Sequence, residues 1–150
     1  MKKKYTIMRV LYRILLFFSF IFSLSCGSDK PQPIKLNIDS CDFCKMTISN
    51  PQFSCQIITD KGRCYKFDDL SCLLQYIRNT KIKAVYVSDY LNKNMISAND
   101  GFFVKHINFK SPMNGNIACF SNLKESKKYQ SKLHTDVLNW KELTQIYKSY

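Results

Sequence analysis

Two stretches of this chain predict the same succession of secondary structure elements, and this restricts the fold to two similar halves. Each half gives strand, strand, helix, strand, and the junctions before the two helices match in character, with YKFDDL at 65–70 and ACFSNL at 118–123. We place the halves at about 41–90 and 95–139. This succession predicts an α+β domain of two ββαβ halves with a mostly antiparallel sheet.

Hydrophobic alternation, turn residues and helix caps give the individual elements. A hairpin turn is expected around Asp60-Lys61-Gly62. The expected strands lie at 53–59, 63–67, 82–87, 101–108, 116–120 and 136–138. The expected helices run from Asp68 or Asp69 to about 79, from Ser121 or Asn122 to about 133, and from 140 to 148.

Apolar residues at helical spacing support the first and the last helix. Residues three and four positions apart lie on one face of a helix, so each set forms a single apolar stripe. The stripes are Leu70, Leu73, Leu74 and Ile77 in the first helix, and Trp140, Leu143 and Tyr147 in the last. The last helix is therefore expected to close the core.

The first 25 residues predict an export signal rather than a part of the folded domain. A basic start precedes the apolar run 14–25, which is short for a bilayer span of about 20 residues. The run ends in SLSCGS, which resembles a bacterial lipobox, so Cys26 is the expected lipidation site. An uncleaved anchor helix and ordinary secretory cleavage are the alternatives. Each places the domain outside the cytoplasm, with a tether at 26–35 and the folded part at 36–150.

The net charge of +12 falls to +7 without the first 25 residues, which contain five basic residues and no acidic ones. The remaining basic residues are spread out and are not interleaved with aromatic side chains as in a base-stacking platform. We therefore expect no nucleic-acid partner. A solvated basic face near anionic lipid is the favoured interpretation.

The chain contains seven cysteines, but their spacing does not define a disulfide framework. In a hairpin with a two-residue turn, Thr59 faces Cys64, and Cys55 lies four residues further along the strand, too far for a bond to Cys64. Four cysteines are therefore expected to be small buried core residues: Cys55, Cys64, Cys72 and Cys119.

Two sulfur-bearing segments predict a metal site. CDFCKM at 41–46 places Cys44 and Met46 two residues apart, on one side of an extended segment, and SPMNG at 111–115 holds Met113 in a loop where no core requires it. Thiolate and thioether sulfur are soft ligands that favour Cu(I) over hard ions. We therefore predict a Cu(I) site with few ligands, formed by Cys44 and Met113, with Met46 as a further candidate.

Other residues near these segments leave several interpretations open. Cys41 forms Cys-x-x-Cys with Cys44 and is a second copper ligand, a disulfide partner or a bystander. His106 is a weak further candidate, because its expected strand leads into the Met113 loop. Asp68-Asp69 at a helix start is best explained by capping. No Ser/His/Asp set, zinc spacing or phosphate loop occurs, so we do not expect an enzyme.

Short motifs along the mature chain occur in an order that resembles a known family. They are CKM at 44–46, Pro51, QI at 56–57, FDD at 67–69, YVSD at 86–89, ISA at 96–98, FV at 103–104, PM at 112–113 and Phe120. The family is NosL, the copper-binding accessory lipoproteins of nitrous oxide reductase maturation, and the resemblance spans about 41–143. Lys45 stands where the family usually has glycine, and Pro-Met-Asn-Gly replaces the usual Pro-Met-Gly.

The resemblance implies a fold of two ββαβ halves related to the organomercurial lyase fold. It implies a Cu(I) site on Cys44 and Met113, with Met46 as a third sulfur. It also implies delivery of copper to a membrane complex that assembles the copper centres of the reductase.

We therefore expect a non-catalytic Cu(I) carrier that a lipid anchors to a bacterial membrane, facing the periplasm or the exterior. Its expected partner is a copper-accepting membrane or periplasmic assembly factor, and the carrier itself is a monomer or forms transient complexes. Two alternatives remain: a thiol–disulfide oxidoreductase that uses Cys41 and Cys44, and a surface lipoprotein whose sulfur atoms only pack.

Overall fold

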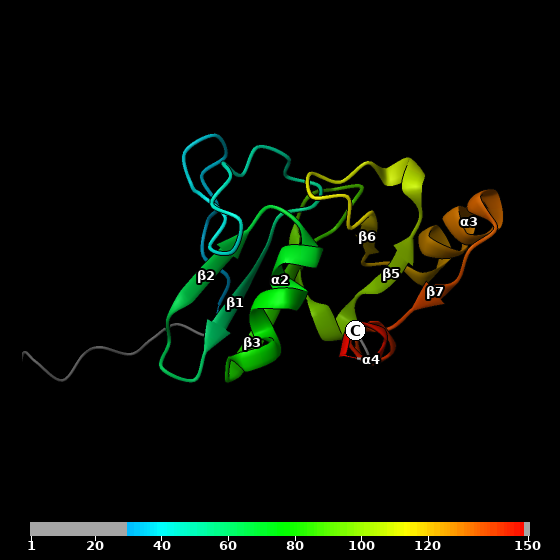
Figure 1. Cartoon of the computed structure of the whole chain (residues 1–150). Helices are drawn as coiled ribbons and strands as arrows, with labels where there is room; N and C mark the ends of the chain where they lie inside the picture. Colours follow the sequence, from blue (N-terminus) through cyan, green and yellow to red (C-terminus); the bar gives the residue numbers. More distant parts are fainter. Residues whose placement is uncertain (1–29, 149–150) are drawn as a thin grey trace, which may run out of the picture.

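The computed structural model describes residues 30–148, which fold into two antiparallel sheets with helices packed against them (Figure 1). The expected signal at 1–25, the lipidation site Cys26 and the start of the tether lie outside the described residues. Within 30–148, no helix combines the length and the apolar character that a bilayer crossing requires.

The first unit joins a hairpin, a helix and a returning strand. Its elements are β1 (Cys55–Thr59), β2 (Cys64–Phe67), α2 (Leu70–Tyr76), the 3-10 helix η1 (Ile77–Asn79) and β3 (Ile82–Ser88). The strand order is β2-β1-β3-β4, in which β4 (Met95–Ser97) is an edge strand that the sequence did not predict. The sequence placed residues 95–97 in the second half, and they pair with β3 of the first unit.

The second unit repeats the arrangement of the first. Its elements are β5 (Phe102–Lys105), the 3-10 helix η3 (Ile107–Phe109), β6 (Ile117–Phe120), α3 (Leu123–Leu133) and β7 (Val137–Leu138). The strand order β6-β5-β7 matches β2-β1-β3, and every strand pair within the two sheets is antiparallel. The predicted α+β class with two ββαβ units is confirmed.

The main core lies between the first sheet, α2 and the last helix, α4 (Trp140–Lys148). The predicted stripes face this core: Leu70, Leu73, Leu74 and Leu143 are buried, and Ile77, Trp140 and Tyr147 pack against them. Phe103 and Cys119 of the second unit belong to the same cluster. The two units therefore share this core, and α4 closes it as predicted. The second unit also has a smaller cluster of its own, formed by Val104, Phe109, Ala118 and Phe120 together with Phe53.

The hairpin turn differs from the expected one by one residue. Ile58, rather than Thr59, pairs with Cys64. The loop has three residues because Gly62 adopts a φ of 74°, a left-handed conformation that glycine reaches without steric cost. Cys55 lies three residues from Ile58 and therefore points to the opposite face from Cys64. The two form no disulfide, and every cysteine within 30–148 is a free thiol.

The strand expected at 101–108 is too long, because β5 ends at Lys105. Beyond it, His106 Nδ1 accepts a hydrogen bond from the backbone N–H of Asn108 (3.2 Å) and caps η3. Such a local side-chain bond offers the backbone an alternative to the sheet ladder. The strand assignment of His106 was wrong for this reason.

Asp89, which directly follows β3, joins the two units. Its Oδ1 accepts hydrogen bonds from the backbone N–H groups of Leu91 (2.8 Å) and Asn92 (2.9 Å), and its Oδ2 accepts one from Ser121 (2.6 Å). Burial by itself would raise the pKa of Asp89, but these hydrogen bonds outweigh it and hold the pKa below its ordinary value of 3.8. The carboxylate form therefore stabilises the junction between the units.

We predict that Asp89→Asn destabilises the domain by about 1–3 kcal/mol at pH 7, because the amide keeps one acceptor and presents an NH₂ group to the remaining donors. The pKa of Asp89 is lowered on folding, so its contribution is complete above pH 3.8 and is lost as the pH falls through the lower folded value. Urea unfolding measures the free energy of unfolding at pH 7 and pH 3. Its decrease between pH 7 and pH 3 should be smaller in Asp89→Asn than in the wild type. The exposed Asp136→Asn serves as the control, and equal stability of the two variants at pH 7 would contradict this role.

Candidate metal centre

The segment 41–46 forms a tight turn that is attached to the edge of β2. Cys41 N–H donates to Met46 O (2.8 Å), and Lys45 N–H donates to Cys41 O (3.0 Å). Asp42 and Lys66 of β2 exchange two hydrogen bonds, one between their backbones (2.8 Å) and one from Lys66 N–H to Asp42 Oδ2 (2.7 Å). The turn requires a φ of 66° at Lys45, a conformation that favours glycine.

Three thiols and a carboxylate converge where this turn meets the start of α2. The Sγ atoms of Cys41, Cys44 and Cys72 and a carboxylate oxygen of Asp68 all lie within 4.8 Å of one another. Cys41, Cys72 and Asp68 are buried, whereas Cys44 is partly exposed. Cys44 Sγ donates to Asp68 Oδ1 across 3.6 Å. We call these four residues the thiol cluster.

The thiol cluster has the electrostatic properties of a cation site. Burial raises the pKa of the Cys41 thiol to about 11 and raises the pKa of Cys72 far above its ordinary value, with the nearby Cys41 and Asp68 adding to the effect. Within the described chain, Asp68 Oδ2 is buried without a hydrogen-bond partner. A buried carboxylate oxygen without a partner is costly, and a bound cation would compensate it and keep the thiolates ionised.

Asp69, the next residue, holds the Met113 loop against the start of α2. Its Oδ2 accepts hydrogen bonds from Met113 N–H (2.9 Å) and Ser111 Oγ (2.5 Å), while its Oδ1 accepts one from Ser71 N–H (2.8 Å). The loop comes so close that a Cβ on Gly115 would lie 2.5 Å from Asp69 Oδ1. Two consecutive carboxylates thus bring the thiol cluster and the Met113 loop to one end of α2.

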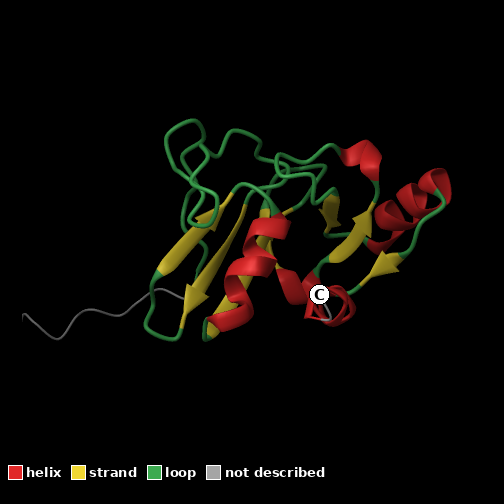
Figure 2. Cartoon of the chain, viewed as in Figure 1, coloured by secondary structure: helices red, strands yellow, loops and turns green. Residues whose placement is uncertain are grey.

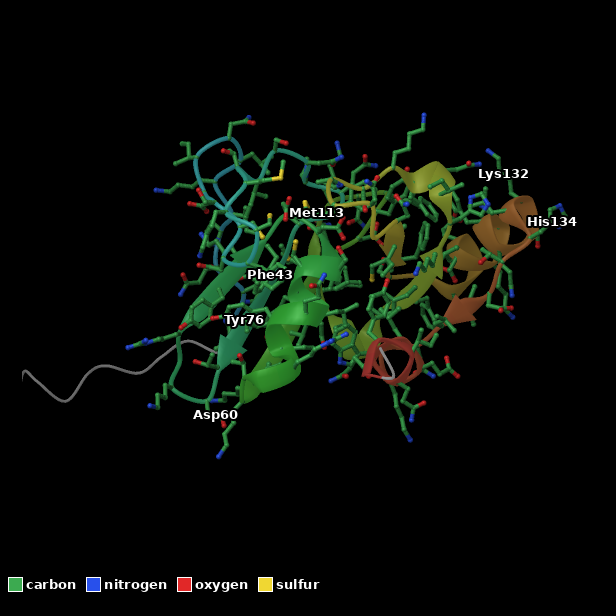
Figure 3. The ribbon with its side chains drawn as sticks, in the orientation of Figure 1. Phe43, Asp60, Tyr76, Met113, Lys132 and His134 are labelled. Atoms are coloured by element: carbon green, nitrogen blue, oxygen red, sulfur yellow. The ribbon has the colours of Figure 1, made fainter. Side chains whose placement is uncertain are left out.

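The figures show this convergence at the level of the whole molecule. In Figure 2 the loops gather at one end of the first sheet, above the start of α2, whereas α4 lies at the other end. Met113 and Phe43 both lie at the loop end in Figure 3. Met46 and Met113 are exposed by 52% and 39%, so both side chains are accessible from solvent.

The structure places the remaining candidate residues differently. Either Asp68 or Asp69 was expected to cap α2, and the N-cap is Asp69. Asp68 belongs to the thiol cluster instead. Cys72 is buried as predicted, yet it lies among the other thiols rather than serving only the core. Asp68 precedes the N-cap and is not part of the helix, so no helical spacing linked it to Cys72 in the sequence. The Nδ1 atom of His106 is used in capping η3.

Comparison with known proteins identifies the family. The family model of NosL matches residues 33–147. The chain belongs to the NosL family. This confirms the resemblance that its motifs predicted.

A solved NosL structure shares the fold. The copper chaperone NosL from Shewanella denitrificans superimposes with a TM-score of 0.68 at 21% sequence identity, over 79% of this chain and 98% of the other. No curated protein matches the sequence.

We predict that Asp69→Asn releases the Met113 loop while leaving α2 capped. Asparagine is as good an N-cap as aspartate, so its oxygen still accepts from Ser71 N–H. Its NH₂ group, however, then faces Met113 N–H, which loses its acceptor. Amide hydrogen exchange at Met113 should speed up by about tenfold or more, which corresponds to a lost hydrogen bond to a charged group of about 1.5–3 kcal/mol.

Asp136→Asn, at an exposed position outside the loop, is the matched control for this exchange measurement. Unchanged protection of Met113 in Asp69→Asn would show that other contacts hold the loop.

Proposed function

We propose that this protein binds Cu(I) as cargo through Cys44, Met113 and Met46, and passes it to an acceptor outside the cytoplasm. One observation carries the proposal: Asp68 and Asp69 bring the thiol cluster and the Met113 loop to the same end of α2. Membership of the NosL family and the likeness to a copper chaperone support it. The sulfur donors at this end are of the kind that selects Cu(I).

The exposure of the three proposed ligands suits transfer rather than storage. Cys44 is the only partly exposed thiol of the cluster, and both methionine side chains reach solvent. A donor from the acceptor can therefore approach the ion before the first ligands leave. The buried Cys41, Cys72 and Asp68 lie behind Cys44 as additional donors.

Cys44 must lose its proton before it can act as a thiolate ligand. Asp68 Oδ1 accepts the hydrogen bond of this thiol, and because Cys44 is partly exposed, its proton can leave to solvent when the ion binds. The protein's own contribution is thus to position the ligands, without chemical turnover.

The acceptor is a membrane or periplasmic assembly factor, and its client is nitrous oxide reductase. This part of the proposal rests on the family, whose members serve that maturation. A lipid on Cys26 would anchor the carrier to a membrane of the cell envelope, and the exchange of ions requires only a monomer in transient contact with its acceptor.

We predict that Cys44→Ser and Met113→Leu each weaken Cu(I) binding by about tenfold or more, or about 1.4 kcal/mol per factor of ten. Each substitution removes a soft sulfur donor at nearly constant volume. A titration with a competing Cu(I) chelator measures the effect. Met95→Leu is the matched control, because it removes a half-buried thioether in β4. Affinity that is equal in Met113→Leu and Met95→Leu would refute the proposed ligand set.

The oxidoreductase alternative predicts a disulfide reductase activity that requires Cys41 and no metal. In a Cys-x-x-Cys enzyme the first cysteine is an exposed thiol with a lowered pKa, whereas Cys41 is fully buried and its pKa is raised to about 11. We therefore predict no disulfide reductase activity in the metal-free protein. An insulin reduction assay tests this, with Cys41→Ser as the control. Activity that is present in the wild type and lost in Cys41→Ser would favour the enzyme instead.

A further inference from the structure

A cleft of about 740 Å³ lies at the end of the molecule away from the thiol cluster. It is bounded by the C-terminal part of α2, η1, the start of β3, the 3-10 helix η2 (Ala98–Asp100) and α4. Its apolar walls include Leu74, Ile77, Ile82, Val85, Trp140 and Tyr147. The volume is in the range of ligand-binding clefts, and apolar walls with a few polar residues are typical of such sites.

The charged residues that line this cleft are basic. Arg78 and Lys83 line it, and no acidic residue does. Arg78 Nη2 donates to Tyr147 O (3.0 Å), which holds the guanidinium at the cleft.

The β1–β2 turn lies next to the start of β3, because Thr59 pairs with Ile82. The segments 60–63 and 78–83 contain five basic residues and the single acid Asp60: Lys61, Arg63, Arg78, Lys81 and Lys83. We call this surface the basic end. Its charge is complementary to an anionic head group.

The chain geometry allows a lipid anchor to bring the basic end to a membrane. The Gln56 side chain accepts from Gln32 N–H and donates to Gln32 O, both at 2.9 Å, and so fixes the end of the tether to β1. Six residues from Cys26 to Gln32 span at most about 20 Å, while four strand residues from Gln56 to Asp60 span only about 14 Å. The tether is therefore long enough for the basic end to face the bilayer.

We propose that the basic end docks on an anionic phospholipid bilayer and that the cleft takes up one acyl chain of a lipid whose head group binds Arg78 and Lys83. This rests on the lipid anchor of the proposed function. The lipid anchor keeps the domain close to the membrane, and the basic end fixes its orientation, since basic residues are attracted to anionic leaflets. The thiol cluster then faces away from the membrane.

Trp140 provides a direct test, because it is the only tryptophan and it lines the cleft. The full lipidated protein is placed in phosphatidylcholine vesicles, with or without phosphatidylglycerol, whose acyl chains carry bromine, a quencher of tryptophan fluorescence. The lipid anchor holds the protein on both membranes, so a difference reports docking rather than partitioning. We expect roughly twofold stronger quenching with the anionic lipid, and loss of that difference at 1 M salt, where the Debye length is about 3 Å.

Variants separate the head-group contact from the acyl-chain site. The double variant Arg78→Glu and Lys83→Glu should remove the extra quenching, whereas Lys127→Glu together with Lys132→Glu on α3 makes the same charge change elsewhere and should not. Thr144→Phe places a bulky ring at the cleft and should abolish the quenching that comes from an acyl chain inside it.

Equal quenching in neutral and anionic vesicles, or none in either, would overturn the proposal. Quenching by a soluble brominated fatty acid but not by vesicles would also overturn it, because the ligand would then be a free acid. A Cu(I) titration on the same samples keeps the two proposals apart. Normal copper affinity without anionic quenching rejects only the docking, and lost copper affinity with quenching rejects only the carrier.

Discussion

The carboxylate of Asp69 is the interaction on which the candidate site depends. It is buried, and a buried charge is stable only when its lone pairs are satisfied. Its three donors come from α2 and from the loop 111–115, so the loop can leave only by stripping a buried charge of partners. The core holds α2 in place, and the Asp69 side chain holds the Met113 loop against α2, so the packing of the core fixes the position of Met113.

Much of the fold was predictable because its signals are local. The stripes of α2 and α4, the cap residues Asp69 and Asn122 and the repeated order of elements can each be found within a short window of sequence. The family could also be predicted, because its motifs are spread in a fixed order along the chain. The edge strand β4 was missed, since three residues are too few to show alternation, and its pairing with β3 depends on the tertiary fold.

The composition of the thiol cluster depends on tertiary structure in the same way. A buried cysteine in a helix has the same local sequence whether it packs or faces other thiols, so Cys72 was assigned to the core alone. Asp69 caps α2 and holds the Met113 loop, whereas Asp68 joins the thiol cluster. Which residue takes which role depends on the neighbours that each carboxylate contacts in the folded protein. At Lys45 the sequence showed the difference from the family but not its reason. The structure supplies the reason, because the φ of 66° at this position favours the glycine that is usual in the family.

The helix α2 also sets how far the candidate site stands from the membrane in the proposed orientation. Its N-terminal end meets the thiol cluster, and its other end, with η1, meets the cleft. Ten helical residues from Leu70 to Asn79 measure about 15 Å, which exceeds the Debye length of about 8 Å at physiological ionic strength. The anionic surface that attracts the basic end therefore has little influence on the thiols. One short helix would thus let the same small domain bind a membrane at one end and exchange an ion with a protein at the other.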